Sequence, residues 1–311
     1  MINYYIAENS KVEKILEIQN ACWINMIDPT EKEINYISEK LFIDADALKA
    51  ALDEEERARV EIEDEYQMIV VDVPTSEEKH GKQSYITIPL SIIVLENHLI
   101  TVCTEDTGLL SHFEDGRIKN FYTRMKTRFI LQILYRNASM FLSYLRSIDK
   151  KTDIVKNRLH KSTQNKELIQ LLELEKSLLY FTTSLKGNQV VLDKLLKNPA
   201  IKRYEEDEDL LEDTIIENSQ AIEMAGIYSG ILRGMMDCFA SVISNNLNRV
   251  MKLLAAMTII MSIPTMIFSA LGMNVIIPFG SEPWAFAAIL FGSVLFSGII
   301  TFIFYKAKMF K

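Results

Sequence analysis

The chain has 311 residues, with 34 Lys and Arg against 42 Asp and Glu, so its formal net charge is −8. The charge is divided unevenly, because residues 1–248 carry 29 basic and 41 acidic side chains and residues 249–311 carry five and one. An acidic soluble part argues against nucleic acid as a partner, since phosphate binding needs a basic surface. The three cysteines are odd in number and lack a CxxC spacing, which argues against a disulfide framework and a zinc site.

The first 104 residues mix strand and helix signals, which predicts an α/β domain with a mixed or parallel sheet. The predicted strands cover residues 22–27, 66–73, 86–95 and 98–103. A helix is expected to start near Glu31, after a turn at Asp28–Pro29. A hairpin turn is expected at Asn97–His98 and a loop at 76–81. The N-terminus lacks a basic segment followed by an apolar core, so we expect no signal peptide and a cytoplasmic domain.

Long helices are predicted for the next region, 105–204, because apolar residues recur at helical spacing with almost no Gly or Pro. Two helices are expected, over 121–159 and 168–196. The acidic run 205–209 is expected to be a solvated helix start, with a rim that collects cations as the alternative. The helix that follows can continue to Leu271, and at ~1.5 Å per residue it is about 90 Å long.

Two uncharged windows, 253–281 and 283–305, each exceed the ~20 residues that cross a bilayer as a helix. The predicted segments are a stalk helix over 205–273 that becomes a first span at about 251–273, a loop over 274–283, a second span over 284–305 and a basic tail over 306–311. Lys and Arg flank the spans on one side only, because the loop has none. The positive-inside rule therefore predicts two spans in the plasma membrane with both termini in the cytoplasm.

A stripe of small and polar residues follows one face of the long helix at alternating steps of four and three. We call it the small-residue stripe, and its members are Gly230, Gly234, Asp237, Ser241, Ser244, Asn248, Met251, Ala255, Thr258, Ser262, Thr265 and Ser269. Such a repeat keeps one face toward a common axis in a left-handed bundle. The stripe predicts either a pore lining or a close contact between helices. In a pore, Met251 and the neighbouring Leu254 would form an apolar constriction that gates by dewetting.

Enzymatic chemistry is not indicated by any motif. The histidines at 80, 98, 112 and 160 are scattered, without the spacing of a nucleophile and base or of metal ligands. There is also no glycine loop of the kind that cradles phosphates. We therefore expect a protein that is not an enzyme and that uses neither ATP nor an organic cofactor.

Gly272–Met273–Asn274 closes the first of the two C-terminal spans, after a long stalk and an acidic domain. With this position, the tripeptide resembles the signature of the CorA family of magnesium channels. The resemblance also covers Trp23–Ile24–Asn25 with Pro29–Thr30, the stretch from Leu174 to Asn188, and Ser262–Ile263–Pro264–Thr265. The chain departs from the family pattern at Leu271, where an aromatic residue is common, and in the loop 278–283.

The resemblance implies a homopentamer with a funnel-shaped cytoplasmic part, the first span lining the pore and the second facing lipid. It assigns Gly272, Met273 and Asn274 to a filter that hydrogen-bonds hydrated Mg²⁺, which prefers oxygen ligands. Glu282 would supply an outer acidic ring that attracts cations. The implied function is passive Mg²⁺ uptake driven by membrane potential.

Regulation by intracellular Mg²⁺ is a further implication of the resemblance, through carboxylates between neighbouring domains. The candidate carboxylates are Asp213, Asp53 or the glutamates that follow it, and Asp237 on the stripe. A transporter of Zn²⁺, Co²⁺ or Ni²⁺ with the same fold is the alternative, although those ions favour nitrogen and sulfur ligands and the stripe has no His or Cys. A membrane-anchored scaffold without transport is the alternative from another class.

Overall fold

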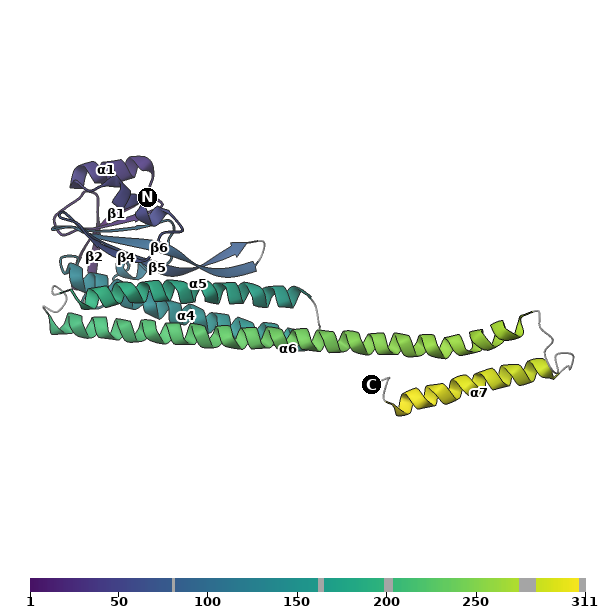
Figure 1. The fold of residues 1–311 in the computed structure, drawn as a ribbon. Helices are drawn as coiled ribbons and strands as arrows, with labels where there is room; N and C mark the ends of the chain where they lie inside the picture. Colours follow the sequence, from purple (N-terminus) through teal and green to yellow (C-terminus); the bar gives the residue numbers. More distant parts are fainter. Residues whose placement is uncertain (80–81, 162–164, 199–203, 274–283, 308–311) are drawn as a thin grey trace. The chain divides into compact units, whose positions relative to one another are not determined.

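The computed structural model describes residues 1–79, 82–161, 165–198, 204–273 and 284–307 (Figure 1). By its internal contacts the chain divides into two units, Met1–Gly234 and Met235–Lys311. The first unit holds a β-sheet and the long helices that cover it. The second unit holds the membrane part of the last long helix and one further helix.

The sheet of the first unit has seven strands in the order β2-β1-β3-β7-β6-β5-β4. Their bounds are β1 Ile2–Glu8, β2 Lys11–Ile15, β3 Trp23–Ile27, β4 Arg59–Ile62, β5 Gln67–Lys79, β6 Lys82–Val94 and β7 Leu99–Cys103. The pair β3 and β7 is parallel and every other pair is antiparallel. The expectation of a mixed or parallel sheet is therefore confirmed in its mixed form.

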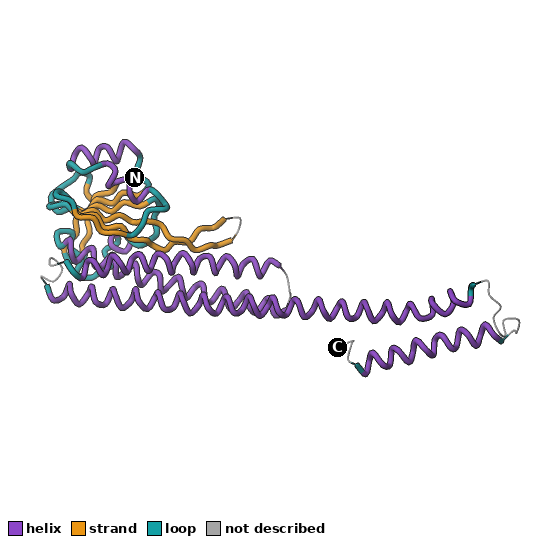
Figure 2. The backbone as a smooth tube through the Cα atoms, viewed as in Figure 1, coloured by secondary structure: helices purple, strands orange, loops and turns teal. Residues whose placement is uncertain are grey.

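The predicted loop over 76–81 is wrong for its described residues. Ser76–Lys79 continue β5 and pair with β6, from Ser76 opposite Tyr85 to Lys79 opposite Lys82. The hairpin extends past the rest of the sheet and lies along helix α5, Asn165–Leu196 (Figure 2). Charged residues can occupy such a ribbon because its backbone groups bond between the two strands and need no buried face.

Two helical layers cover the sheet (Figure 2). One face packs against α1 Glu31–Leu41, α2 Ala45–Lys49 and the 3₁₀ turn Ala50–Leu52. The other face packs against the short α3 Ser111–Glu114 and the long helices α4 Lys126–Lys161, α5 Asn165–Leu196 and the first part of α6. Strand side chains alternate between these cores, as Trp23 and Ile24 do in β3.

Helix boundaries follow from local chemistry. Thr30 caps α1 in a reciprocal capping box with Glu33, which agrees with the predicted start near Glu31. Helix α4 starts at Lys126 rather than near Phe121, because Phe121 is fully buried and its carbonyl accepts a hydrogen bond from the Ser10 amide. The two remaining helices are α6 Glu205–Leu271, with 67 residues, and α7 Ala285–Lys306, with 22 residues.

Candidate functional site

Helices α6 and α7 are both long and apolar enough to cross a membrane. In each case only 6% of the most apolar 18-residue window is buried inside the structure. The core helix of a soluble protein would be largely buried, so this exposure favours a lipid environment for both helices.

The membrane part of the small-residue stripe lies exposed on α6. Its exposed members are Asn248, Met251, Ala255, Thr258, Ser262, Thr265 and Ser269. Three hydroxyls donate to carbonyls of their own helix, Thr258 Oγ1 to Leu254 at 2.8 Å, Ser262 Oγ to Ile259 at 2.8 Å and Thr265 Oγ1 to Met261 at 3.0 Å. The proton of each hydroxyl is thus used locally, and the oxygen lone pairs remain available to a donor outside the helix.

Met251 and Leu254, the predicted constriction, are 57% and 53% exposed. More than half of each side chain is thus uncovered in the described part of one chain. Both are therefore free to contact another copy of the chain or to narrow a passage.

Gly272 directly follows Leu271, the last residue of α6, and its amide donates to the Phe268 carbonyl at 2.9 Å. A Cβ at this position would lie 3.3 Å from the same carbonyl oxygen, so glycine fits the tight helix end. Met273 follows and is 62% exposed. Asn274 and Glu282, the remaining predicted residues of this end, lie outside the described residues.

The three candidate regulatory carboxylates, Asp53, Asp213 and Asp237, are all exposed. Among the described residues, no group of three or more His, Cys, Asp or Glu side chains is arranged to hold a metal ion. Within one chain these three carboxylates therefore do not build a metal centre.

The acidic start of α6 is not uniformly solvated, which corrects the expectation for residues 205–209. Asp207 is only 5% exposed, and Glu206 forms an ion pair with Arg128 of α4. Burial raises the pKa of Asp207, while Arg128 opposes this shift. This end of α6 is thus docked on α4 rather than free as a rim.

A polar joint connects α5 to the sheet, and the sequence patterns did not reveal it. Strand β4 pairs with β5 only as far as Val70, which leaves the β5 edge open at Asp72. Asn188 of α5 closes that edge, because its Oδ1 accepts from the Asp72 amide at 2.9 Å and its Nδ2 donates to the Asp72 carbonyl at 2.8 Å. Asn137 of α4 donates to the same carbonyl at 2.8 Å.

A second buried network of side-chain hydrogen bonds joins strands β3 and β7. The Trp23 indole donates to Thr101 Oγ1 at 2.8 Å, and Thr101 donates to Asn25 Oδ1 at 3.0 Å. Asn25 Nδ2 then donates to Glu114 Oε1 in α3 at 2.8 Å. Trp23 and Asn25 of the Trp-Ile-Asn motif are thus used to tie two strands to a helix.

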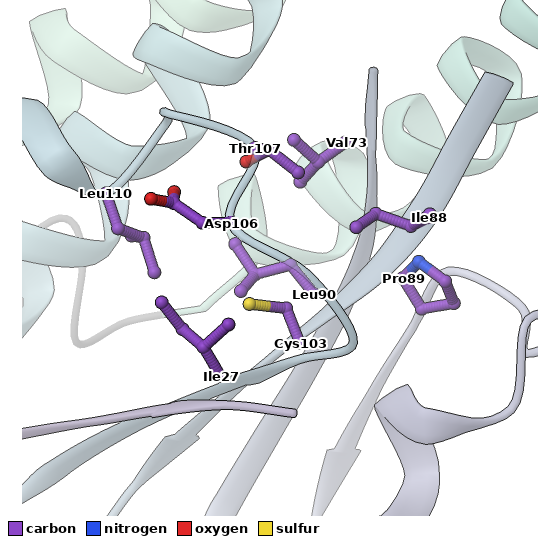
Figure 3. A pocket seen from close by; sticks show the side chains of 9 residues that line it. All are labelled: Ile27, Val73, Ile88, Pro89, Leu90, Cys103, Asp106, Thr107 and Leu110. Atoms are coloured by element: carbon purple, nitrogen blue, oxygen red, sulfur yellow. The ribbon is translucent and has the colours of Figure 1, made fainter. Parts of the chain in front are cut away.

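A small cavity lies at the carboxyl ends of β3 and β7 (Figure 3). Its volume of about 10 Å³ holds one water at most. Among the lining residues, Cys103 and Asp106 carry groups that can ionise. Burial raises the pKa of the Cys103 thiol to about 12. Such a thiol stays protonated, so Cys103 offers no thiolate nucleophile to this cavity.

Comparison with known proteins places this geometry in a family. The family model described as CorA-like Mg²⁺ transporter protein matches residues 19–306. The chain belongs to this family. The cobalt/magnesium transport protein CorA of Methanocaldococcus jannaschii is 26% identical over 312 residues, which cover 97% of this chain and 95% of the relative.

Solved structures agree with the fold of this CorA-like chain. The complete structure of the CorA magnesium transporter from Methanocaldococcus jannaschii matches with a TM-score of 0.85 and 24% identity, covering 98% of this chain and 97% of that one. The full-length CmaX protein matches with a TM-score of 0.69 and 14% identity, covering 97% and 96%. The predicted arrangement of an N-terminal α/β domain, long helices and apolar C-terminal helices is thereby confirmed.

Proposed function

We propose that this CorA-like chain forms a passive Mg²⁺ channel in the plasma membrane, with α6 of each copy lining the pore and α7 outside it. The observation that carries the proposal is the exposed small-residue stripe, which runs along α6 from Asn248 to Ser269. Exposed hydroxyls in a span favour a wet surface over lipid. Before the span the stripe continues as Asp237, Ser241 and Asn248, where a close helix contact would favour Leu or Ile, so it supports a pore lining over a purely structural helix contact.

The hydroxyl geometry suits a hydrated cation. Mg²⁺ gives up its waters reluctantly, so a pore for it must bind the outer hydrogens of those waters. Thr258, Ser262 and Thr265 direct acceptor lone pairs outward, because their protons are bonded to the helix backbone. An inside-negative potential would drive the ion inward with about 4.6 kcal/mol per 100 mV for its two charges.

The filter and the gate are proposed at the two ends of this stripe. Gly272 follows the end of α6 and leads into Met273 and Asn274. The side-chain amide of Asn274 would hydrogen-bond the hydrated ion, while Glu282 would concentrate cations outside. Met251 and Leu254 would form the apolar gate at the inner end.

A closed pore requires several copies, because the two spans of one chain cannot enclose a passage. We propose a homopentamer with a funnel-shaped cytoplasmic part. In support, α5 leaves four apolar residues exposed on its outer surface, Ile169, Leu172, Leu179 and Val190. Their spacing of three, seven and 11 residues places them on one face of the helix, as expected of a contact with another chain. Native mass spectrometry of the purified protein would count the copies.

Regulation by internal Mg²⁺ is proposed to use the exposed carboxylates Asp53, Asp213 and Asp237 between neighbouring copies, since a single chain does not assemble them. Both termini are proposed to face the cytoplasm, with Arg249 and Lys252 before the first span and Lys306 after the second. Co²⁺ is the second candidate cargo, because the relative at 26% identity is named a cobalt/magnesium transport protein.

Mg²⁺ influx into proteoliposomes loaded with a fluorescent indicator tests the proposal, under an inside-negative potential. We expect flux in the wild type and its loss or a broadened ion preference in Asn274→Ala. The matched control is Asn246→Ala, which removes an asparagine of α6 at a position off the stripe. Competition with Co²⁺ and Zn²⁺ then ranks the cargo ions.

Two results would contradict the proposal. Equal Mg²⁺ flux through wild type and Asn274→Ala would reject the filter assignment. An absence of flux from folded, oligomeric wild type at low and at high internal Mg²⁺ would favour the membrane-anchored scaffold.

A further inference from the structure

Pro264 interrupts the hydrogen-bond ladder of α6 in the middle of the first span. Proline has no N–H, so the carbonyl of Ile260, four residues earlier, loses its helical partner. Inside a bilayer no water replaces that partner, and an unsatisfied carbonyl costs several kcal/mol. A donor from elsewhere in the unit would therefore stabilise this turn.

The affected turn faces α7. Within the second unit, the less exposed residues of α6 recur at steps of three and four along one face, and they are Leu253, Ala256, Ile260, Ile263, Pro264, Ile267 and Leu271. The less exposed residues of α7 form a matching face, and they are Ala285, Ile289, Ser293, Ser297, Ile300 and Phe304. Figure 1 shows α7 running back beside this part of α6. The two faces therefore cover each other.

Ser297 is the residue of that α7 face with an unused donor. Its Oγ is buried and has no hydrogen-bond partner among the described residues. Ser293, one turn earlier, differs because its hydroxyl already donates to the Leu290 carbonyl at 2.8 Å. Of the side-chain polar atoms in the described parts of both spans, Ser297 Oγ alone is buried and unpaired.

Depth in the membrane matches as well. Ile260 and Pro264 lie 11 and seven residues before Leu271, the last residue of α6 (271 − 260 and 271 − 264). Ser297 lies 12 residues after Ala285, the first residue of α7 (297 − 285). Counted from these two ends at ~1.5 Å per residue, the Ile260 carbonyl and Ser297 lie at nearly the same distance along their helices.

We propose that Ser297 is a positioning residue of the second span that donates its hydroxyl to the Ile260 carbonyl left unpaired by Pro264. The bond is not formed in this structure, and rotation about the single side-chain torsion of serine moves the hydroxyl between three staggered positions. Once formed, the bond would hold the helix turn at Pro264 in place and hence the direction of the stripe residues on either side of it. Its effect on transport depends on the proposed channel function, whereas the bond itself does not.

Pair-selective labelling can observe this carbonyl directly. Ile260–Met261 is the only Ile-Met dipeptide in the chain, so ¹³C-carbonyl isoleucine with ¹⁵N methionine yields a single correlated signal. In full-length protein in lipid bilayers, we expect the carbonyl resonance to move upfield in Ser297→Ala and to stay in place in Ser293→Ala. Ser297→Thr keeps a hydroxyl and should retain the wild-type resonance.

Flux measurements on the same variants test the positioning role. Ser297→Ala should lower Mg²⁺ flux several-fold and Ser297→Thr should restore it. Pro264→Ala returns an N–H to the helix, so adding Ser297→Ala to that background should change neither flux nor carbonyl resonance. If Ser297→Ala alone fails to fold, comparison of this double variant with Pro264→Ala still tests the proposal.

Three outcomes would overturn the proposal. The first is a carbonyl resonance unchanged by Ser297→Ala in folded protein, and the second is an equal change from Ser293→Ala. The third is an undiminished effect of Ser297→Ala in the Pro264→Ala background. If the wild type conducted no ions while the resonance responded as expected, the channel function would fail and the hydrogen bond would stand.

Discussion

Asn188→Ala is expected to destabilise the first unit by removing the hydrogen bonds of the polar joint between α5 and β5. Asn188 is 4% exposed and makes two hydrogen bonds to the backbone of Asp72, at 2.9 and 2.8 Å. Alanine leaves the Asp72 amide without this acceptor at the open edge beyond β4. The Asp72 carbonyl, in contrast, keeps its bond from Asn137 at 2.8 Å.

The size of the effect follows from that asymmetry. One buried N–H left unsatisfied costs about 1–3 kcal/mol, and loss of the second bond adds up to about 1 kcal/mol. For a unit of this length, a destabilisation of 1 kcal/mol lowers Tm by roughly 2–4 °C. Asn188→Ala should therefore lower Tm by about 2–16 °C.

Asn137→Ala is the matched control. It removes one of two donors to the same carbonyl, and it also removes Asn137 Oδ1, which is buried and has no partner among the described residues. The expected cost is therefore at most about 1 kcal/mol.

Thermal unfolding of the full-length protein in detergent, followed by fluorescence, measures both variants. The chain has two tryptophans, so a Trp284→Phe background makes Trp23 the reporter of the first unit. Equal Tm shifts for Asn188→Ala and Asn137→Ala, or a shift below about 2 °C for Asn188→Ala, would refute a stabilising role of the Asn188 hydrogen bonds to Asp72.

Three further predictions concern the polar networks and the gate. Thr101→Val keeps the side-chain shape but leaves the Trp23 indole without its acceptor and Asn25 without a donor. The same melting assay should therefore show a decrease of about 2–4 kcal/mol in the free energy of unfolding. A decrease below about 1 kcal/mol would contradict this prediction. Burial raises the pKa of the Asp72 carboxyl, and a hydrogen bond from Ser184 opposes this shift. The folded state therefore binds the Asp72 proton more tightly than the unfolded state does. The stability of the fold consequently falls as pH rises through the raised pKa. Asp72→Asn should accordingly raise Tm at neutral pH, with a gain that disappears as pH falls below the ordinary aspartate range, and a gain independent of pH would count against this cause. Met251→Ala should increase Mg²⁺ leak through the closed protein, measured as indicator signal without an applied potential, whereas an unchanged leak would argue against Met251 as part of the gate.

The sequence was sufficient for elements with strong periodicity or clear end signals. The long helices, the strand at Trp23–Ile27 and the capped start of α1 were predicted because each depends on neighbours in the chain. The prediction failed at Ser76–Lys79, where charged residues suggested a loop and pairing with β6 makes a strand. The strands β1, β2 and β4 were not predicted. Strands β2 and β4 have only five and four residues, whereas β1 contains the strand-forming Tyr4, Tyr5 and Ile6, a signal that could have found it.

In the candidate site, too, the features that depend on local spacing could be predicted and those that depend on distant residues could not. The small-residue stripe could be predicted because helical geometry alone places its members on one face. The role of Asn188 could not, because its partner Asp72 is 116 residues away in the chain. The same holds for Ser177, whose Oγ accepts from the Tyr85 amide at a separation of 92 residues. Polar contacts of this range depend on the tertiary fold and leave no local pattern.

Thr258→Val offers the sharpest test of whether the stripe faces a passage. Thr258 and Thr301 are equivalent in local chemistry, since each is exposed and each donates to the carbonyl four residues earlier at 2.8 Å. Valine has nearly the same shape, and the carbonyl that loses the hydroxyl remains bonded within its helix. Local stability should therefore change equally at the two sites.

The two variants differ only in what the removed oxygen faces. If Thr258 lines a pore, Thr258→Val removes an acceptor for the water around the ion from every copy at one level, and Mg²⁺ flux should fall several-fold. Thr301→Val in α7 should leave flux unchanged. Equal flux in both variants would mean that the stripe serves contact between helices, because packing tolerates the methyl group where a hydrated ion requires the oxygen.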